Sequence, residues 1–194
     1  IRDVAVTGVQ TCALPICQGM DNGQYEKYII LPNNKNIILA AQQLKKMLGE
    51  KVHIVPSTNP MEGLAAAMAF SKENTLEDNL TAMTERMGDI TSAMITTAVR
   101  DSVVGKSVIH KDDFMGLTRN HEVVAEKDFS TCFNKVLSLI TTEDTEIVTV
   151  YYGKDLSEED CRKELDKAEK KYPDITFEMY DGGQPLYPMF ISAE

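Results

Sequence analysis

Tyr28-Ile-Ile-Leu-Pro-Asn-Asn-Lys-Asn-Ile37 joins a short apolar run to a polar corner. An apolar run of this length that ends in proline is typical of a buried parallel strand. Either Asn34 or Asn36 can accept a hydrogen bond from a free backbone N–H at the start of a helix. The segment therefore predicts a strand over residues 26–31 that turns directly into a helix.

The residues after this corner complete a strand–helix–strand unit. The helix is indicated by apolar side chains at helical spacing, which are Ile37, Ala41, Leu44 and Leu48. Gly49 ends the helix, and the β-branched residues 52–55 predict a second strand. Such a βαβ unit has parallel strands and a right-handed crossover, so we expect parallel strands here.

Two more helices are predicted before residue 91. The first begins at Asn59-Pro60, with proline at its first position, and its expected inner face is Leu64, Ala65 and Met68. Thr75 and Asp78 form a capping-box-like pair for the second, whose apolar stripe is Leu76, Leu80, Met83 and Met87. We therefore expect a small α/β lobe over residues 17–90.

The pattern changes at Thr91, where short β-branched segments begin. Strands are predicted over residues 93–99, 114–117, 122–125 and 146–152, with a hairpin over residues 103–109 around Gly105. Asp128 begins a helix with an apolar face of Phe129, Phe133, Val136, Leu137 and Ile140. Ser157 begins another, with Cys161, Leu165 and Ala168 facing inward.

The last predicted element is a hairpin formed by residues 175–180 and 186–191 around Gly182-Gly183. Pro188 would place its second strand at a sheet edge or a bulge. The expected fold class is thus α/β with two lobes: an N-terminal βαβ lobe with parallel strands, and a C-terminal mixed-sheet α+β lobe over residues 91–194.

The charge balance limits the classes of partner. The chain has 30 acidic and 20 basic side chains, a net charge of −10, which disfavours nucleic acid and anionic membranes as partners. No apolar run approaches the ~20 residues of a membrane-spanning helix, so we expect a cytoplasmic protein. The four cysteines show no CxxC spacing, so neither a disulfide framework nor a zinc site is predicted.

The polar corner and Gly182-Gly183-Gln184-Pro185-Leu186-Tyr187 together resemble the C-terminal region of the bacterial fatty acid kinase large subunit. That family, of the FakA or YloV type, is dihydroxyacetone-kinase-like. The likeness runs from about Tyr28 to Glu194 and includes residues 147–153. The predicted order of the two lobes also resembles DegV-like fatty-acid-binding proteins, which bind an acyl chain between such lobes.

The resemblance implies a non-catalytic C-terminal domain of a kinase. In the family, an N-terminal domain binds ATP and magnesium, and a small separate protein presents the fatty acid that is phosphorylated. This region is therefore expected to dock the DegV-like, fatty-acid-binding partner or to join subunits as a homodimer. It is expected to hold no cofactor or metal and to contribute no catalytic residue.

Two alternatives remain open. One is a DegV-like module that itself binds an acyl chain or a phosphorylated ligand. The other is an enzyme with phosphatase-like activity, which the sequence disfavours because no nucleophile with a paired base is evident. The histidines do not change this balance, because His53, His110 and His121 are scattered along the chain.

Three segments supply candidate ligand-binding or partner-binding residues. They are Asn33, Asn34, Lys35 and Asn36 at the corner, then Arg100, and finally Gly182, Gly183, Gln184 and Tyr187. The corner lies where α/β proteins bind anions, beyond a strand's carboxyl end and at a helix N-terminus. A capped surface connection is the alternative, and the corner lacks the glycines of a P-loop.

The other two segments have structural alternatives as well. Arg100 would suit an anion or a partner's carboxylate, or a local ion pair at a strand end. Gly182 and Gly183 permit positive φ, so that Gln184 and Tyr187 could project from the tip of a turn. Simple hairpin chemistry accounts for the same residues.

Residues 6–16 read Val-Thr-Gly-Val-Gln-Thr-Cys-Ala-Leu-Pro-Ile, which is similar to the translation of a common sequencing adapter. We therefore expect residues 1–16 to be an artefact, the domain to begin near Cys17, and upstream domains to be missing. By its pattern alone the segment would pass as a weak strand and a turn. It lacks the apolar stretch of a signal peptide, so export is not predicted.

Overall fold

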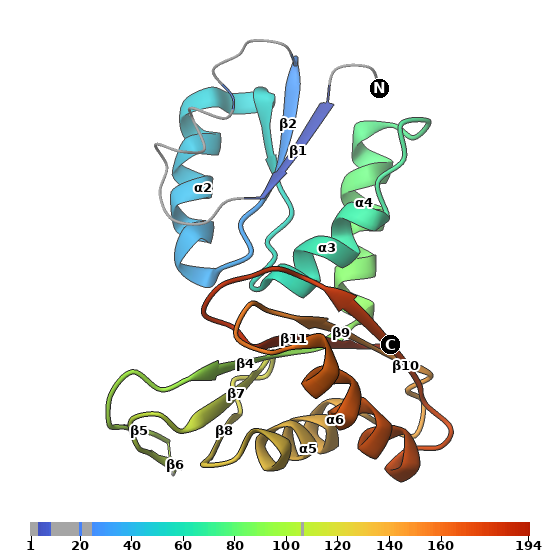
Figure 1. Ribbon diagram of the computed structural model, residues 1–194. Helices are drawn as coiled ribbons and strands as arrows, with labels where there is room; N and C mark the ends of the chain where they lie inside the picture. Colours follow the sequence, from blue (N-terminus) through green and yellow to red (C-terminus); the bar gives the residue numbers. More distant parts are fainter. Residues whose placement is uncertain (1–3, 9–19, 21–24, 106) are drawn as a thin grey trace. The chain divides into compact units, whose positions relative to one another are not determined.

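A computed structural model describes residues 4–8, 20, 25–105 and 107–194 (Figure 1). The chain divides into two units, residues 1–90 and residues 91–194, each with its own core. Within the described residues, no helix is long and apolar enough to cross a membrane.

The first unit contains a three-stranded parallel sheet with the order β1-β2-β3. Its strands are β1 (Val4–Gly8), β2 (Lys27–Leu31) and β3 (Val52–Ile54). Tyr28 lies opposite Val52, so the predicted parallel βαβ unit is confirmed. β1 falls within residues 1–16, the stretch expected to be an artefact, and pairs with β2 along its full length.

Helices cover both faces of this sheet, because successive side chains of β2 point to opposite sides. Tyr28 and Ile30 pack against α2 (Lys35–Leu48). Ile29 and Leu31 pack on the other side, in the cluster formed with α3 (Pro60–Met68) and α4 (Leu76–Asp89). Figure 1 shows α2 on one side of the strands and α3 and α4 on the other. Burial of both faces accounts for the continuous apolar run in the sequence.

The predicted inner face of α3 is wrong in two of its three residues. Ala65 is buried, but Leu64 is exposed and Met68 is 73% exposed. Met61 and Ala66 are buried instead, and α3 packs against α4. The nine-residue helix has apolar residues on most sides, so periodicity does not select one face. Leu48, at the end of α2, is also exposed rather than buried.

The second unit is built on a six-stranded mixed sheet with the order β10-β9-β11-β4-β7-β8. Its strands are β4 (Thr91–Thr97), β7 (Phe114–Thr118), β8 (Val123–Glu126), β9 (Ile147–Tyr152), β10 (Thr176–Asp181) and β11 (Met189–Ala193). β9 and β10 are parallel, and all other neighbours are antiparallel. The predicted hairpin around Gly105 is confirmed as a separate ribbon of β5 (Ser102–Val104) and β6 (Ser107–Ile109).

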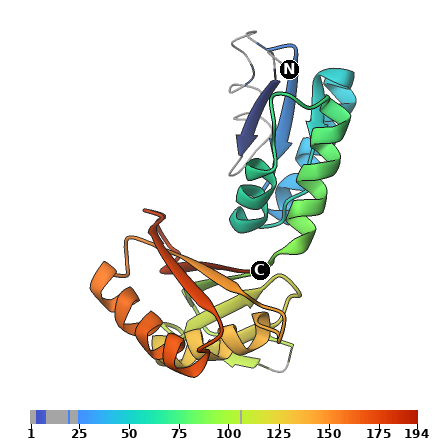
Figure 2. The ribbon, with the colours of Figure 1, turned by 90° about the vertical axis from the view of Figure 1, so that its right-hand side faces the viewer.

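Two helices, α5 (Phe129–Ile140) and α6 (Glu158–Lys171), cover one face of this sheet (Figure 2). The predicted inner faces of both helices are confirmed, except that Phe129 is only partly buried. Cys132 and Cys161 lie within this core, where burial raises the pKa of their thiols to about 12 and about 11. Both cysteines therefore act as small apolar residues, as the sequence predicts.

The terminal hairpin predicted from the sequence is wrong. β10 and β11 are not neighbours, because β9 lies between them and pairs with both. β11 is an inner strand between β9 and β4, and all five of its residues are buried. Pro188 immediately precedes β11, so it removes no hydrogen bond from the ladder, and its carbonyl accepts one from Gly153 N at 2.9 Å.

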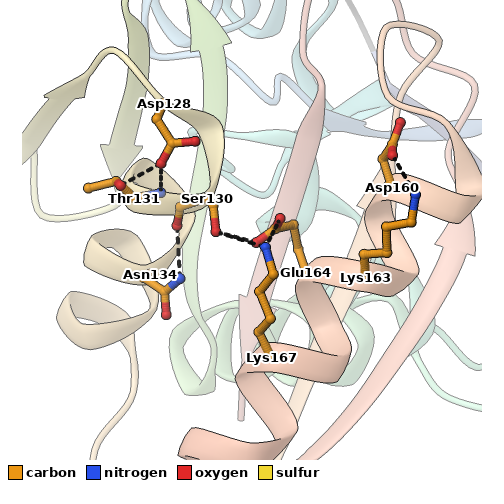
Figure 3. Close-up of polar contacts among 8 residues, drawn as sticks. All are labelled: Asp128, Ser130, Thr131, Asn134, Asp160, Lys163, Glu164 and Lys167. Carbon is orange, nitrogen blue, oxygen red and sulfur yellow. Dashed lines mark hydrogen bonds and ion pairs between the residues drawn. The ribbon is translucent and has the colours of Figure 1, made fainter.

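Polar contacts join α5 to α6 at their exposed sides (Figure 3). Ser130 Oγ donates to Glu164 Oε2 at 2.6 Å, and Lys167 Nζ pairs with Glu164 Oε1 at 2.7 Å. Asn134 Nδ2 donates to the carbonyl oxygen of Ser130 at 2.9 Å. The largely buried Glu164 thus fixes the two helices against each other beside the core.

Acid should weaken the cap of α5. Asp128 accepts hydrogen bonds from the backbone and hydroxyl of Thr131, and these lower the pKa of Asp128 below its usual 3.8. A lowered folded-state pKa stabilises the protein above pH ~3.8, and this contribution is lost as the pH falls further. Asp128→Asn keeps a cap but loses the charge. In urea titrations, wild type should be the more stable at pH 7, and the difference should shrink towards pH 3; a constant difference would contradict this.

Close packing of β7 on α5 can be tested at Gly116. A Cβ at this position would lie 2.1 Å from Val136 Cγ2. Gly116→Ala should therefore lower the free energy of unfolding by about 1–3 kcal/mol in chemical denaturation. Gly88→Ala in α4 is the matched control, because nothing lies within 4 Å of its added Cβ. We expect that control to be neutral or to gain up to about 1 kcal/mol.

Candidate functional site

The corner after β2 is tied to the loop after β3 by a reciprocal pair of hydrogen bonds. Asn33 N donates to Ser57 Oγ at 3.0 Å, and Ser57 Oγ donates to Asn33 Oδ1 at 2.7 Å. Asn33 has a φ of 55°, a left-handed conformation that asparagine adopts more readily than most residues. Ser57 is completely buried. The carboxyl ends of the two parallel strands are therefore joined through side chains.

Gly63, in the first turns of α3, packs directly on this corner. A Cβ at Gly63 would lie 1.8 Å from Asn33 Oδ1 and 2.6 Å from Asn33 Cγ. Only a residue without a side chain leaves room for the Asn33 amide. The position of Asn33 thus depends on a glycine thirty residues later in the chain.

The N-terminus of α3 is capped by its own side chains. Asn59 Oδ1 accepts from Glu62 N at 3.0 Å, and Glu62 Oε2 accepts from Thr58 N at 2.6 Å and from Thr58 Oγ1 at 2.9 Å. Glu62 is buried, so its carboxylate would repel an anion bound at this helix end. The sequence analysis missed the roles of Ser57, Thr58 and Glu62, although an acidic residue three positions after Asn59 is a capping-box signal.

The other three corner residues lie at the surface. Asn34 is the cap of α2: its Oδ1 accepts from Asn36 N at 2.9 Å, and its carbonyl accepts from Ile37 N at 3.0 Å. Asn34, Lys35 and Asn36 are all exposed. Their side chains therefore lie where a ligand or a partner could reach them, whereas Asn33 is engaged within the fold.

The segment from Gly182 to Tyr187 is held down by Gln184. Gln184 Nε2 donates to the carbonyl oxygens of Tyr151 at 2.9 Å and of Tyr187 at 3.2 Å, so the expectation that it projects from a turn is wrong. A Cβ on Gly182 would lie 2.0 Å from Gln184 Oε1, and Gly183 has a φ of 59°. The Tyr187 ring contacts that of Phe190, with ring centres 5.1 Å apart.

Arg100 and this loop both lie at the end of the second unit's sheet where β4 ends and β11 begins. β11 runs antiparallel to β4, so the loop before β11 meets the carboxyl end of β4, where Thr96 Oγ1 donates to the carbonyl of Leu186 at 2.9 Å. Arg100 follows three residues after β4. Within the described residues it is exposed and forms no ion pair; its neighbour Asp101 accepts from Lys111 N at 2.7 Å instead. Each unit thus places its candidate residues at the carboxyl ends of strands.

Comparison with known families identifies the chain. The family of FakA-like fatty acid kinase C-terminal regions matches residues 4–194. The chain belongs to this family. It is 32% identical over 179 residues to an uncharacterised protein of Staphylococcus aureus (strain USA300), a match that covers 92% of this chain and 33% of the relative. The chain therefore spans about a third of the length of that relative.

Solved structures of similar fold come from two groups. A fatty-acid-binding DegV family protein from Thermus thermophilus has a TM-score of 0.62 at 10% identity, covering 95% of this chain and 78% of that protein. The dihydroxyacetone kinase from C. freundii has a TM-score of 0.63 at 10% identity, covering 99% and 48%. The DegV-like, two-lobe α/β fold expected from the sequence is therefore confirmed.

The packing of Gly63 against Asn33 gives a double-mutant test. Gly63→Ala alone should lower the free energy of unfolding by about 1–3 kcal/mol, because the new methyl group displaces the Asn33 amide. In an Asn33→Gly background the same change should be neutral or stabilising, because glycine tolerates the positive φ and removes the clash. Urea titrations of the four proteins would measure this coupling, and equal costs in both backgrounds would refute the contact.

Proposed function

We propose that this chain is a non-catalytic docking region of a fatty acid kinase. It binds the separate DegV-like protein whose fatty acid is phosphorylated elsewhere on the kinase. The observation that carries this proposal is the match of residues 4–194 to the C-terminal family of FakA-like fatty acid kinases. The kinase acts in the cytoplasm, and its subunits pair as a homodimer.

The hydrogen bonds of the candidate residues support a role in binding a partner rather than in catalysis. Gln184 and Asn33, the polar residues most suggestive of a ligand site, both hydrogen-bond within their own unit. In the second unit, Leu186 near Gln184 is 74% exposed, and Val99, two residues after β4, is 85% exposed. In this proposal, both side chains are available to contact the partner.

ATP and magnesium belong, in this proposal, to a domain that precedes the present chain in the whole kinase. No group of three or more His, Cys, Asp or Glu in the described part of the chain is placed to hold a metal ion.

A second candidate function is a module that itself binds an acyl chain or a phosphorylated ligand. It is favoured by the fold likeness to the fatty-acid-binding protein from Thermus thermophilus. The exposed Lys35 at the N-terminal end of α2 is its best candidate contact for an acidic head group. The buried carboxylate of Glu62 at the neighbouring α3 disfavours an anion there.

One experiment separates the two functions. The full 194-residue chain is purified and mixed with a fatty-acid-loaded DegV family protein encoded in the same genome. We expect the two to co-elute in size-exclusion chromatography, while native mass spectrometry of the chain alone shows no bound lipid. Lipid on the chain alone without co-elution would favour the module, and its loss in Lys35→Ala would locate the head group. If the partner does not co-elute and the chain carries no lipid, both proposed functions are contradicted.

A further inference from the structure

Leu186 combines a strained backbone with an exposed apolar side chain. Its φ is 70°, in the left-handed region, and the residue is 74% exposed. Apart from asparagine and aspartate, residues with a Cβ seldom adopt this region, because the Cβ approaches the following carbonyl oxygen. Single exposed leucines are ordinary on protein surfaces, but this one also strains its backbone, which glycine or asparagine would strain less. Leucine at this position therefore contributes little to the stability of the fold.

The backbone around Leu186 is fixed by hydrogen bonds to the ends of two strands. Thr96 Oγ1, in β4, donates to the carbonyl oxygen of Leu186 at 2.9 Å. Gln184 Nε2 donates to the carbonyl of Tyr151 in β9 at 2.9 Å, and the Gln184 carbonyl accepts from Lys154 N at 3.0 Å. Strain of this kind persists only where the surrounding structure over-determines it, and it gathers at functional sites. The loop thus presents the Leu186 side chain to solvent on a backbone that these bonds hold in place.

A largely exposed apolar side chain suits a protein partner better than a small molecule. Small ligands bind in concave sites that bury most of their own surface, so the concave part of a contact with Leu186 must come from the other molecule. A second copy of this chain would have to receive Leu186 in a hollow of its own. The described residues form hollows of about 530 and 430 Å³. The first is lined by two lysines, two aspartates and a histidine, and the second by two lysines, a glutamate, a glutamine and a glycine. Neither lining suits a leucine, which favours a different protein as the partner.

We propose that Leu186 is an anchor residue for the DegV-like, fatty-acid-binding partner of the kinase and inserts into an apolar pocket on the surface of that protein. This inference rests on the proposed docking function and adds which side chain makes the contact and what chemistry receives it. The pocket is lined by aliphatic or aromatic side chains, and binding removes both apolar surfaces from water. Because the loop is already fixed, little conformational freedom is lost on binding, so more of this gain remains as affinity.

Two substitutions in the full chain separate backbone strain from contact with the partner. Asparagine tolerates the left-handed region, so Leu186→Asn should raise the midpoint of urea unfolding while it removes the apolar side chain. Leu186→Met keeps both the strain and an apolar side chain of similar volume, so its midpoint should match that of wild type. The binding probe is the fatty-acid-loaded DegV family protein encoded in the same genome. In isothermal titration calorimetry, Leu186→Asn should weaken its binding by about tenfold or more, and Leu186→Met should stay within about threefold of wild type.

Met68→Ala in α3 is the matched control, because Met68 is similarly exposed, at 73%, on an ordinary helix. It should bind like wild type, and circular dichroism should show every variant folded. If Leu186→Asn lowers the urea midpoint, the side chain serves the fold and the anchor role is wrong. If Leu186→Asn binds the partner as well as wild type does, the anchor role is wrong and the docking function stands.

Self-association is checked with the chain alone. In size-exclusion chromatography at one concentration, wild type and Leu186→Asn should elute at the same volume. Later elution of the variant would assign Leu186 to a contact between copies and would contradict the inference. If wild type does not bind the partner, the docking function itself fails, and the anchor role fails with it.

Discussion

Pairing of β9 on both of its sides determines the arrangement of the second unit. β10 lies parallel to β9 on one side, and β11 lies antiparallel on the other. The loop from Gly182 to Pro188 must therefore cross the end of β9. The close approach explains why Gly153 at this end has no room for a side chain, since an added Cβ would lie 2.2 Å from the Tyr187 carbonyl oxygen. It also explains why Gln184 bonds to Tyr151 and why the loop meets the end of β4.

A similar constraint acts on the corner of the first unit. Two parallel strands end at the same edge, and each continues into a connection that must satisfy its own backbone groups. Asn34 caps α2, Asn59 and Glu62 cap the start of α3, and Asn33 with Ser57 joins the two connections. Helix capping and the bond between the two connections therefore account for many of the polar residues in this corner. The side chains left at the surface are those of Asn34, Lys35 and Asn36.

Local signals predicted most of the helices, while the sequence could not reveal pairing between distant segments. The caps at Asn34, Asp128 and Ser157 and the long stripes of α5 and α6 each depend on residues within a few turns of one helix. The neighbours of β11 depend on β4, almost a hundred residues earlier, so a glycine pair that resembled a hairpin turn was misleading. The contact of Gly63 with Asn33 and the inward bond of Gln184 are also non-local. The sequence thus placed the corner of Asn33 to Asn36 at the carboxyl end of a strand, but it did not reveal the roles of Asn33 and Gln184.

These internal bonds bear on how the protein can act. A polar side chain that already holds a loop or caps a helix cannot be released to a substrate without loss of that contact, which costs about 1–3 kcal/mol for a buried group. Catalysis by Gln184, Asn33 or Glu62 would therefore work against the fold that positions them. These internal bonds accordingly give Gln184, Asn33 and Glu62 structural roles.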